Sequence, residues 1–127
     1  MIQTIQSSAV KAYNVINKLS SGSMPISMAY KFFKVKQALK SSYDFQIEQE
    51  QALFDQFHPE YREDSWMFAN EEDRNTFVMK LNEISIMPVE IDIDKQYVTL
   101  DDHIVISIEE MEILDSFIAF TEQDANQ

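Results

Sequence analysis

The scarcity of helix-breaking residues constrains this chain most strongly. Its 127 residues contain a single glycine, Gly22, and three prolines. A β-sandwich or barrel needs many tight turns, which these two residue types normally supply, so both architectures are disfavoured. Neither residue occurs between Pro25 and Pro59, which leaves segment 26–58 free to form one continuous helix. The sequence therefore predicts a fold built on long helices.

Apolar residues at spacings of three and four predict two helices in the first half of the chain. The first spans 3–19 and ends at the small, flexible stretch 20–23. The second spans about 24–57, with Ser23 as its cap and Pro25 in its first turn. Its middle, 40–51, is mostly polar, so we expect it either to project from the body or to bend near 41–42. The expected buried positions of the two helices are Ile5, Ala9, Ala12, Ile16 and Leu19, then Ala29, Phe33, Leu39, Tyr43, Ile47, Leu53, Phe54 and Phe57.

The second half of the chain reads as two shorter helices and a small sheet. After a loop at 60–68, Asn70 caps a third helix that buries Phe77, Leu81 and Ile84 and closes at Pro88. Segment 89–93 alternates apolar and polar residues and, with 96–100, predicts an antiparallel β-hairpin. Segment 103–106 suggests a short third strand. A capping box at Ser107 opens a last helix that runs to about Thr121, with Ile118 on its apolar face.

These elements predict a mostly helical α+β fold. It has four helices, one of them long (about 24–57), and a small antiparallel hairpin at about 89–100 before the last helix. We expect a single domain over 1–121 and a frayed tail at 122–127.

Charge is divided unevenly along the chain. Residues 1–43 hold six lysines and no acidic residue, and residues 44–127 hold four basic and all 22 acidic residues, so +6 and −18 give the net charge of −12. One interpretation is that basic and acidic elements pack together and partly cancel. The other is that a surplus acidic surface repels nucleic acid and membrane phosphates and attracts basic protein surfaces.

The inventory of chemically active residues is poor. The chain has no cysteine, and the two histidines, His58 and His103, lie in no metal or catalytic pattern. Four carboxylates near the expected hairpin, those of Asp92, Asp94, Asp101 and Asp102, are more typical of a solvated turn than of a cation site. We therefore expect no enzyme activity, no cofactor and no metal site. A small metal-dependent enzyme is the least favoured alternative.

Neither a signal peptide nor an apolar run long enough to span a membrane occurs in the sequence. We therefore expect a soluble cytoplasmic protein that contacts no membrane. Lys31, Lys34 and Lys36 alternate with aromatic residues, but the net charge opposes binding to phosphates. A solvated lysine edge beside a buried aromatic stripe is the favoured interpretation, so direct nucleic-acid binding is not expected.

Two stretches carry a resemblance. One is Met24 to Leu39, which opens the long helix; the other combines Phe77 to Glu83, Val89 to Ile93 and Ile106 to Leu114. They resemble a family of small, uncharacterised phage and prophage proteins with a short helix, a long helix, a hairpin and a final helix. The likeness covers about half of the chain and omits the acidic loop around Trp66. It implies a phage or mobile-element origin, hence the host cytoplasm, and no known activity. The layout also loosely resembles prefoldin-type chaperone subunits.

The function expected from these observations is a non-enzymatic interaction protein. Its acidic surface would imitate nucleic acid, and would bind and inhibit the basic surface of a host nucleic-acid-binding or defence protein. The alternative is a phage assembly or chaperone-type protein with a hydrophobic oligomeric interface, formed by Leu53, Phe54 and Phe57. Trp66 is either a core residue or the anchor of the partner. The expected partner-binding residues are Glu60, Glu63, Asp64, Trp66, Glu71, Glu72 and Asp73.

Overall fold

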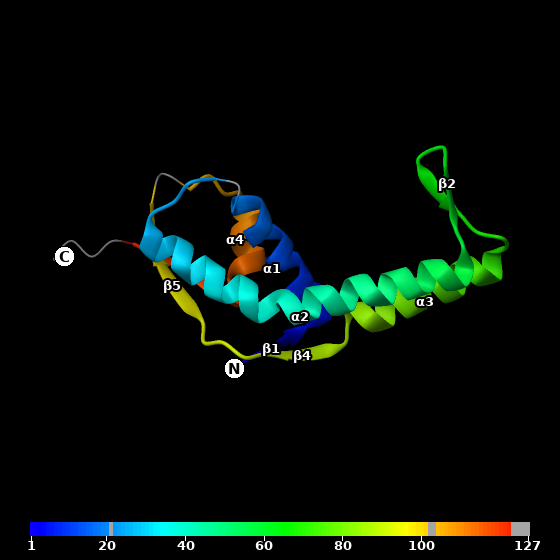
Figure 1. Cartoon of the computed structure of the whole chain (residues 1–127), viewed down its shortest axis with the longest axis horizontal. Coiled ribbons are helices and arrows are strands. Elements are labelled where there is room, and N and C mark those ends of the chain that lie inside the picture. Colours follow the sequence, from blue (N-terminus) through cyan, green and yellow to red (C-terminus); the bar gives the residue numbers. More distant parts are fainter. Residues whose placement is uncertain (21, 102–103, 123–127) are drawn as a thin grey trace.

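The computed structural model describes residues 1–20, 22–101 and 104–122. It confirms the mostly helical α+β class and the four expected helices, one of them long. Figure 1 shows the arrangement. The elements in chain order are β1 (Ile2–Ile5), α1 (Gln6–Leu19), α2 (Ile26–Phe57), β2 (Glu60–Arg62), β3 (Ser65–Met67), α3 (Glu71–Ser85), β4 (Pro88–Ile91), β5 (Gln96–Thr99), α4 (Ile108–Leu114) and β6 (Ile118–Thr121).

Helix α2 crosses the whole molecule and divides it into two parts (Figure 1). Its first half, α1, α4 and the strands β1, β4, β5 and β6 together form one part, which we call the body. Its second half runs beside α3 and carries the β2–β3 hairpin at its far end, and we call this part, residues 44–87, the arm. The helix is unbroken over its 32 residues. Of the two outcomes expected for its polar middle, the structure therefore shows projection.

The body holds the larger hydrophobic core. Ala9 and Ala12 of α1 are fully buried, and their small side chains let α1 approach α2 closely. Val35 and Leu39 fill the α2 side of the contact, and Phe117, after α4, is also fully buried. The body can therefore bury its apolar surface without help from the arm.

The arm has a separate, aromatic core. Leu53, Phe77 and Ile84 are buried there, and Phe54, Phe57 and Phe68 pack around them. The Phe77 ring lies 5.5 Å from that of Phe54, 6.0 Å from that of Phe57 and 5.0 Å from that of Phe68, centroid to centroid. The residues expected to form an oligomer contact, Leu53, Phe54 and Phe57, thus belong to the core that α2 forms with α3, where Leu53 is buried and the two phenylalanines are partly buried.

Three polar side chains are buried between the two cores: Gln6, Ser42 and Gln46. The Gln6 Nε2 donates to the Ser42 backbone oxygen at 2.6 Å and to the Gln46 Oε1 at 3.3 Å. The Gln6 backbone N–H donates to the Met87 oxygen at 2.8 Å, so one residue ties β1 and α1 to α2 and to the end of the arm. Because the amide finds partners, its burial costs little. We call this set the polar junction.

The strands form pairs that the sequence did not predict. The expected hairpin between 89–93 and 96–100 is wrong: β4 pairs antiparallel with β1, with Ile2 opposite Ile91. β5 instead pairs in parallel with β6, with Gln96 opposite Ile118. Each pairing joins segments far apart in sequence and buries Ile91 and Val98 in the body core. The two strands are therefore split between two sheets.

Several boundaries also differ from expectation. Residues 2–5 form a strand instead of the first helical turn, and the last helix ends at Leu114, since segment 118–121 pairs as β6. The cap of α2 is Pro25, with no side-chain hydrogen bond from Ser23. Residues 104–106 form no strand. The expectations for 102–103 and for the tail from 123 onward lie outside the described residues.

The helices capped by Asn70 and Ser107 begin as predicted. The Asn70 side chain accepts a hydrogen bond from the Asp73 N–H, and Ser107 forms a complete capping box with Glu110. Phe77 and Ile84 are buried on α3 as expected. No helix within the described ranges is both long and apolar enough to cross a membrane.

Candidate partner-binding site

The segment expected to be a loop at 60–68 is a tight hairpin. β2 and β3 pair antiparallel with Tyr61 opposite Trp66 and Arg62 opposite Ser65, which leaves Glu63 and Asp64 as a two-residue turn. Both turn residues have positive φ, 50° and 61°. Two-residue hairpin turns of this kind need that backbone, and Asn-Gly normally supplies it. The Glu-Asp pair gives no such signal, which is why sequence reasoning missed the hairpin.

Trp66 lies on the hairpin with one face covered. Its ring packs at 5.0 Å from that of Phe54 on the arm and at 5.2 Å from that of Tyr61 on the facing strand. It remains 50% exposed, and Tyr61 and Met67 are 59% and 53% exposed. Trp66 is therefore a surface residue held in place by aromatic contacts. Tyr61 and Met67 were not among the expected site residues, although they flank Trp66.

The structure gathers the expected carboxylates at the free end of the arm. Glu63 and Asp64 form the hairpin turn, and Glu60 lies on β2 with an ion pair to Arg62 at 2.5 Å. The first turn of α3 begins at the same end (Figure 1) and adds the other three acids. All six are exposed except Asp73, which is partly buried. We call the following set the acidic tip: Glu60, Glu63, Asp64, Trp66, Glu71, Glu72 and Asp73.

The arm as a whole is strongly negative. Residues 44–87 contain 11 acidic and three basic residues, a net charge of −8, whereas the remaining residues contain 11 acidic and seven basic ones, a net charge of −4. Part of the body charge is paired internally, since Lys18 contacts Glu110 at 3.1 Å and the amino terminus contacts Asp94 at 3.7 Å. The negative field is therefore strongest on the projecting part of the molecule.

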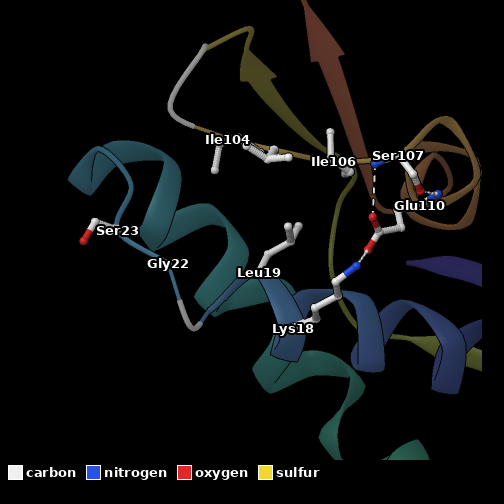
Figure 2. A pocket seen from close by; sticks show the side chains of 9 residues that line it. Lys18, Leu19, Gly22, Ser23, Ile104, Ile106, Ser107 and Glu110 are labelled. Carbon is white, nitrogen blue, oxygen red and sulfur yellow. Dashed lines mark hydrogen bonds and ion pairs between the residues drawn. The ribbon is translucent and has the colours of Figure 1, made fainter.

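A hollow lies on the body, between the end of α1 and the segment before α4 (Figure 2). Its volume is about 610 Å³, and it is lined by Leu19 from α1 and by Ile104 and Ile106 from the segment before α4 (Figure 2). Its charged residues, Lys18 and Glu110, pair with each other, and the Ser107 N–H also donates to the Glu110 carboxylate. Both contacts lower the pKa of Glu110, and the hydrogen bond from Ser107 contributes more than that from Lys18. The charged groups thus stabilise the wall of the hollow.

The other residues singled out in the sequence lie outside the acidic tip. No group of three His, Asp or Glu residues in the described ranges is arranged to hold a metal ion. Asp102 and His103 lie outside those ranges. Lys31 donates to the Tyr97 oxygen and Lys36 to the Asn17 side chain, and the Lys34 ammonium lies 5.2 Å from the Tyr30 ring centroid. The α4 carboxylates lie on the body, away from the acidic tip (Figure 1).

Comparison of the chain with family models, with curated proteins and with solved structures finds no match in any of the three.

Proposed function

We propose that this chain is a non-enzymatic interaction protein that binds a basic surface of another protein through its acidic tip. One observation carries the proposal: the free end of a projecting arm combines six carboxylates with a half-exposed tryptophan. Tryptophan is enriched among the residues that dominate binding energy, and surrounding charges accelerate encounter with a partner of opposite sign.

Two features support a pre-formed site. The Trp66 ring is fixed by Phe54 and Tyr61, so it loses little freedom on binding. The acids of the tip lie on a hydrogen-bonded hairpin turn and on the first turn of α3, where backbone geometry sets their spacing. Carboxylates held in a fixed array can occupy a groove that otherwise binds nucleic-acid phosphates.

The class of partner follows from this chemistry. A groove built for nucleic acid carries lysine and arginine, and an acidic arm competes for it directly. If the phage or mobile-element origin implied by the resemblance holds, the partner is a host nucleic-acid-binding or defence protein, and binding inhibits it. The support for this part is the charge of the arm together with that resemblance.

The test is affinity capture from host lysate at low and high salt, followed by competition with duplex DNA. We expect a basic partner that is retained at low salt, released steeply as salt rises, and displaced by DNA. A variant with E63Q, D64N, E71Q and E72Q should lose capture. A control with E109Q, E112Q, D115N and E122Q neutralises the same number of exposed acids on the body and should retain it. Salt-independent capture, or equal loss in both variants, contradicts the proposal.

A further inference from the structure

One face of α2 is exposed along the entire helix. Exposed residues recur at spacings of three and four from its first turn to its last, so no other element covers this side in the body or in the arm. We call this face the outer stripe. Its residues are Ile26, Tyr30, Phe33, Gln37, Lys40, Ser41, Asp44, Ile47, Glu48, Gln51 and Asp55.

The outer stripe is more apolar than a solvated helix face needs to be. Ile26 is 87% exposed, Tyr30 59%, Phe33 52% and Ile47 47%. A single exposed apolar residue needs no explanation, but several on one continuous face mark an interaction surface. Phe33 and Ile47 were expected to be buried, and their side chains instead point out of both cores.

Charge along α2 changes sign at its midpoint. Segment 26–40 contains four lysines and no acidic residue, whereas segment 41–57 contains four acidic residues and no basic one. Beside the outer stripe, Lys34 represents the basic half, and on the stripe Glu48 and Asp55 represent the acidic half. Lys40 and Asp44, near the midpoint, pair with each other at 2.9 Å within the helix. A surface with this polarity is complementary to itself when it is turned end to end.

We infer that the outer stripe binds the outer stripe of a second copy of this chain, with the two α2 helices antiparallel about a twofold axis. Each basic half then faces the acidic half of the second copy, and the apolar residues are covered. When Phe33 of one copy lies opposite Ile47 of the other, the axis passes position 40, close to Ser41. The same patch serves both subunits, as a closed twofold dimer requires.

A second copy fits this surface better than an unrelated protein. Along α2 the charge is basic in the first half and acidic in the second half. A second copy in the opposite direction necessarily presents the complementary order of charges. The acidic tips lie at opposite ends of this dimer and stay accessible, so the inference is independent of the proposed function. A dimer without tip binding, and tip binding by a monomer, are distinguishable results.

The first experiment measures mass in solution by light scattering over a range of protein concentrations. We expect a mass that rises to twice that of the monomer, with a larger share of monomer at high salt, because charge pairing contributes to the contact. A monomer at every concentration overturns the inference. So does a monomer whose outer stripe binds a different protein.

Disulfide cross-linking tests the orientation, because the natural chain has no cysteine. In the variant S41C the two thiols lie beside the axis, and oxidised glutathione should convert most of the protein to a covalent dimer. The matched control S27C replaces another exposed serine of α2. An axis at position 40 separates its two thiols by about 40 Å along the helices, far beyond disulfide reach. Equal cross-linking of both variants overturns the antiparallel arrangement.

Charge exchange provides an independent readout. The variant K34E/K40E and the variant D44K/E48K should each be monomeric, and their mixture should regain twice the monomer mass. All four positions are at least partly exposed, so circular dichroism should show unchanged helix content. If both variants dimerise as well as the natural chain, charge pairing between the two halves is ruled out and the inference fails.

Discussion

Glu63 and Asp64 hold backbone conformations that side chains normally avoid. A residue other than glycine with positive φ costs about 1 kcal/mol or more, and the turn contains two of them in succession. Asn-Gly would form the same turn with less strain and remove both carboxylates. The strain thus accompanies a gain in negative charge at the turn of the β2–β3 hairpin, in line with the proposed role of the acidic tip.

Trp66 reports on this environment without any label, because it is the only tryptophan. Its half-exposed ring should be quenched by acrylamide. Relative to a free tryptophan derivative, quenching by the caesium cation should be enhanced and quenching by the iodide anion weakened, since the neighbouring carboxylates attract one and repel the other. High salt should reduce the difference. Fluorescence titration with the three quenchers checks this. If none of them reduces the emission, Trp66 is buried in the core.

At the scale of elements, α4 is the shortest helix described and depends on its capping box. The pKa of Glu110 is lowered because the Ser107 N–H and the Lys18 ammonium favour the charged carboxylate. A carboxyl whose pKa falls on folding stabilises the fold above its unfolded pKa of about 4.3, and this stabilisation is lost as pH falls through the folded pKa. The Glu110 contribution should therefore be present at neutral pH and vanish in acid.

The variant E110Q should be less stable than the natural chain at pH 7, and the difference should shrink as pH is lowered below about 4. Urea unfolding followed by circular dichroism at several pH values measures it. The control E112Q changes a neighbouring exposed acid that the capping box does not use. A deficit in E110Q that is the same at every pH would contradict this account.

The helices were predictable because their signals are local. Asn70 and Ser107 lie directly before the residues that they cap, and apolar spacing within each helix needs no knowledge of the rest of the chain. The strand pairing was harder to predict, since the paired residues of β1 and β4 are more than eighty positions apart in the sequence. Ile118 continues the helical spacing of Leu114 and so suggested a longer last helix, whereas its pairing with Gln96 makes it part of a strand.

Leu39 and Leu53 of α2 are buried as expected, whereas Phe33 and Ile47 are exposed for a physical reason. Phe32 and Phe33 are adjacent and equally apolar, so composition cannot choose between them. The structure buries Phe32. About three and four turns farther along the helix, it also buries Ser42 and Gln46. These polar side chains count against burial in any sequence pattern. The Gln46 side chain accepts from Gln6, which is distant in sequence, and donates to Glu50, so its burial is inexpensive. Of the candidate site, the acids were predictable, and the hairpin that presents them was not.

At the scale of the whole molecule, two cores along one helix predict two levels of cooperativity. Phe77→Ala should cost about 3–5 kcal/mol of arm stability, as large truncations in a core do. Amides of α3 should then exchange with solvent faster, while those of α1 stay protected, because the body core contains no arm side chain. Hydrogen exchange resolved along the sequence measures this.

Phe117→Ala makes the matching change in the body, where the side chain is fully buried. It should speed exchange in α1 and in the arm together, because the arm is held in place by α2 and by β4, and β4 pairs with β1 of the body. Equal loss of protection in α1 after either substitution would show that the molecule unfolds as one unit.

Because α2 is unbroken through the polar junction, the arm moves as a rigid body when the helix tilts there. From Gln46 at the junction, the helix extends about 16 Å to Phe57, at 1.5 Å per residue. A tilt of about 10° at the junction displaces that end by roughly 3 Å, which is comparable to the length of a hydrogen bond. The direction in which the hairpin points therefore depends on contacts at the distant polar junction, where Gln6 donates two side-chain hydrogen bonds to α2.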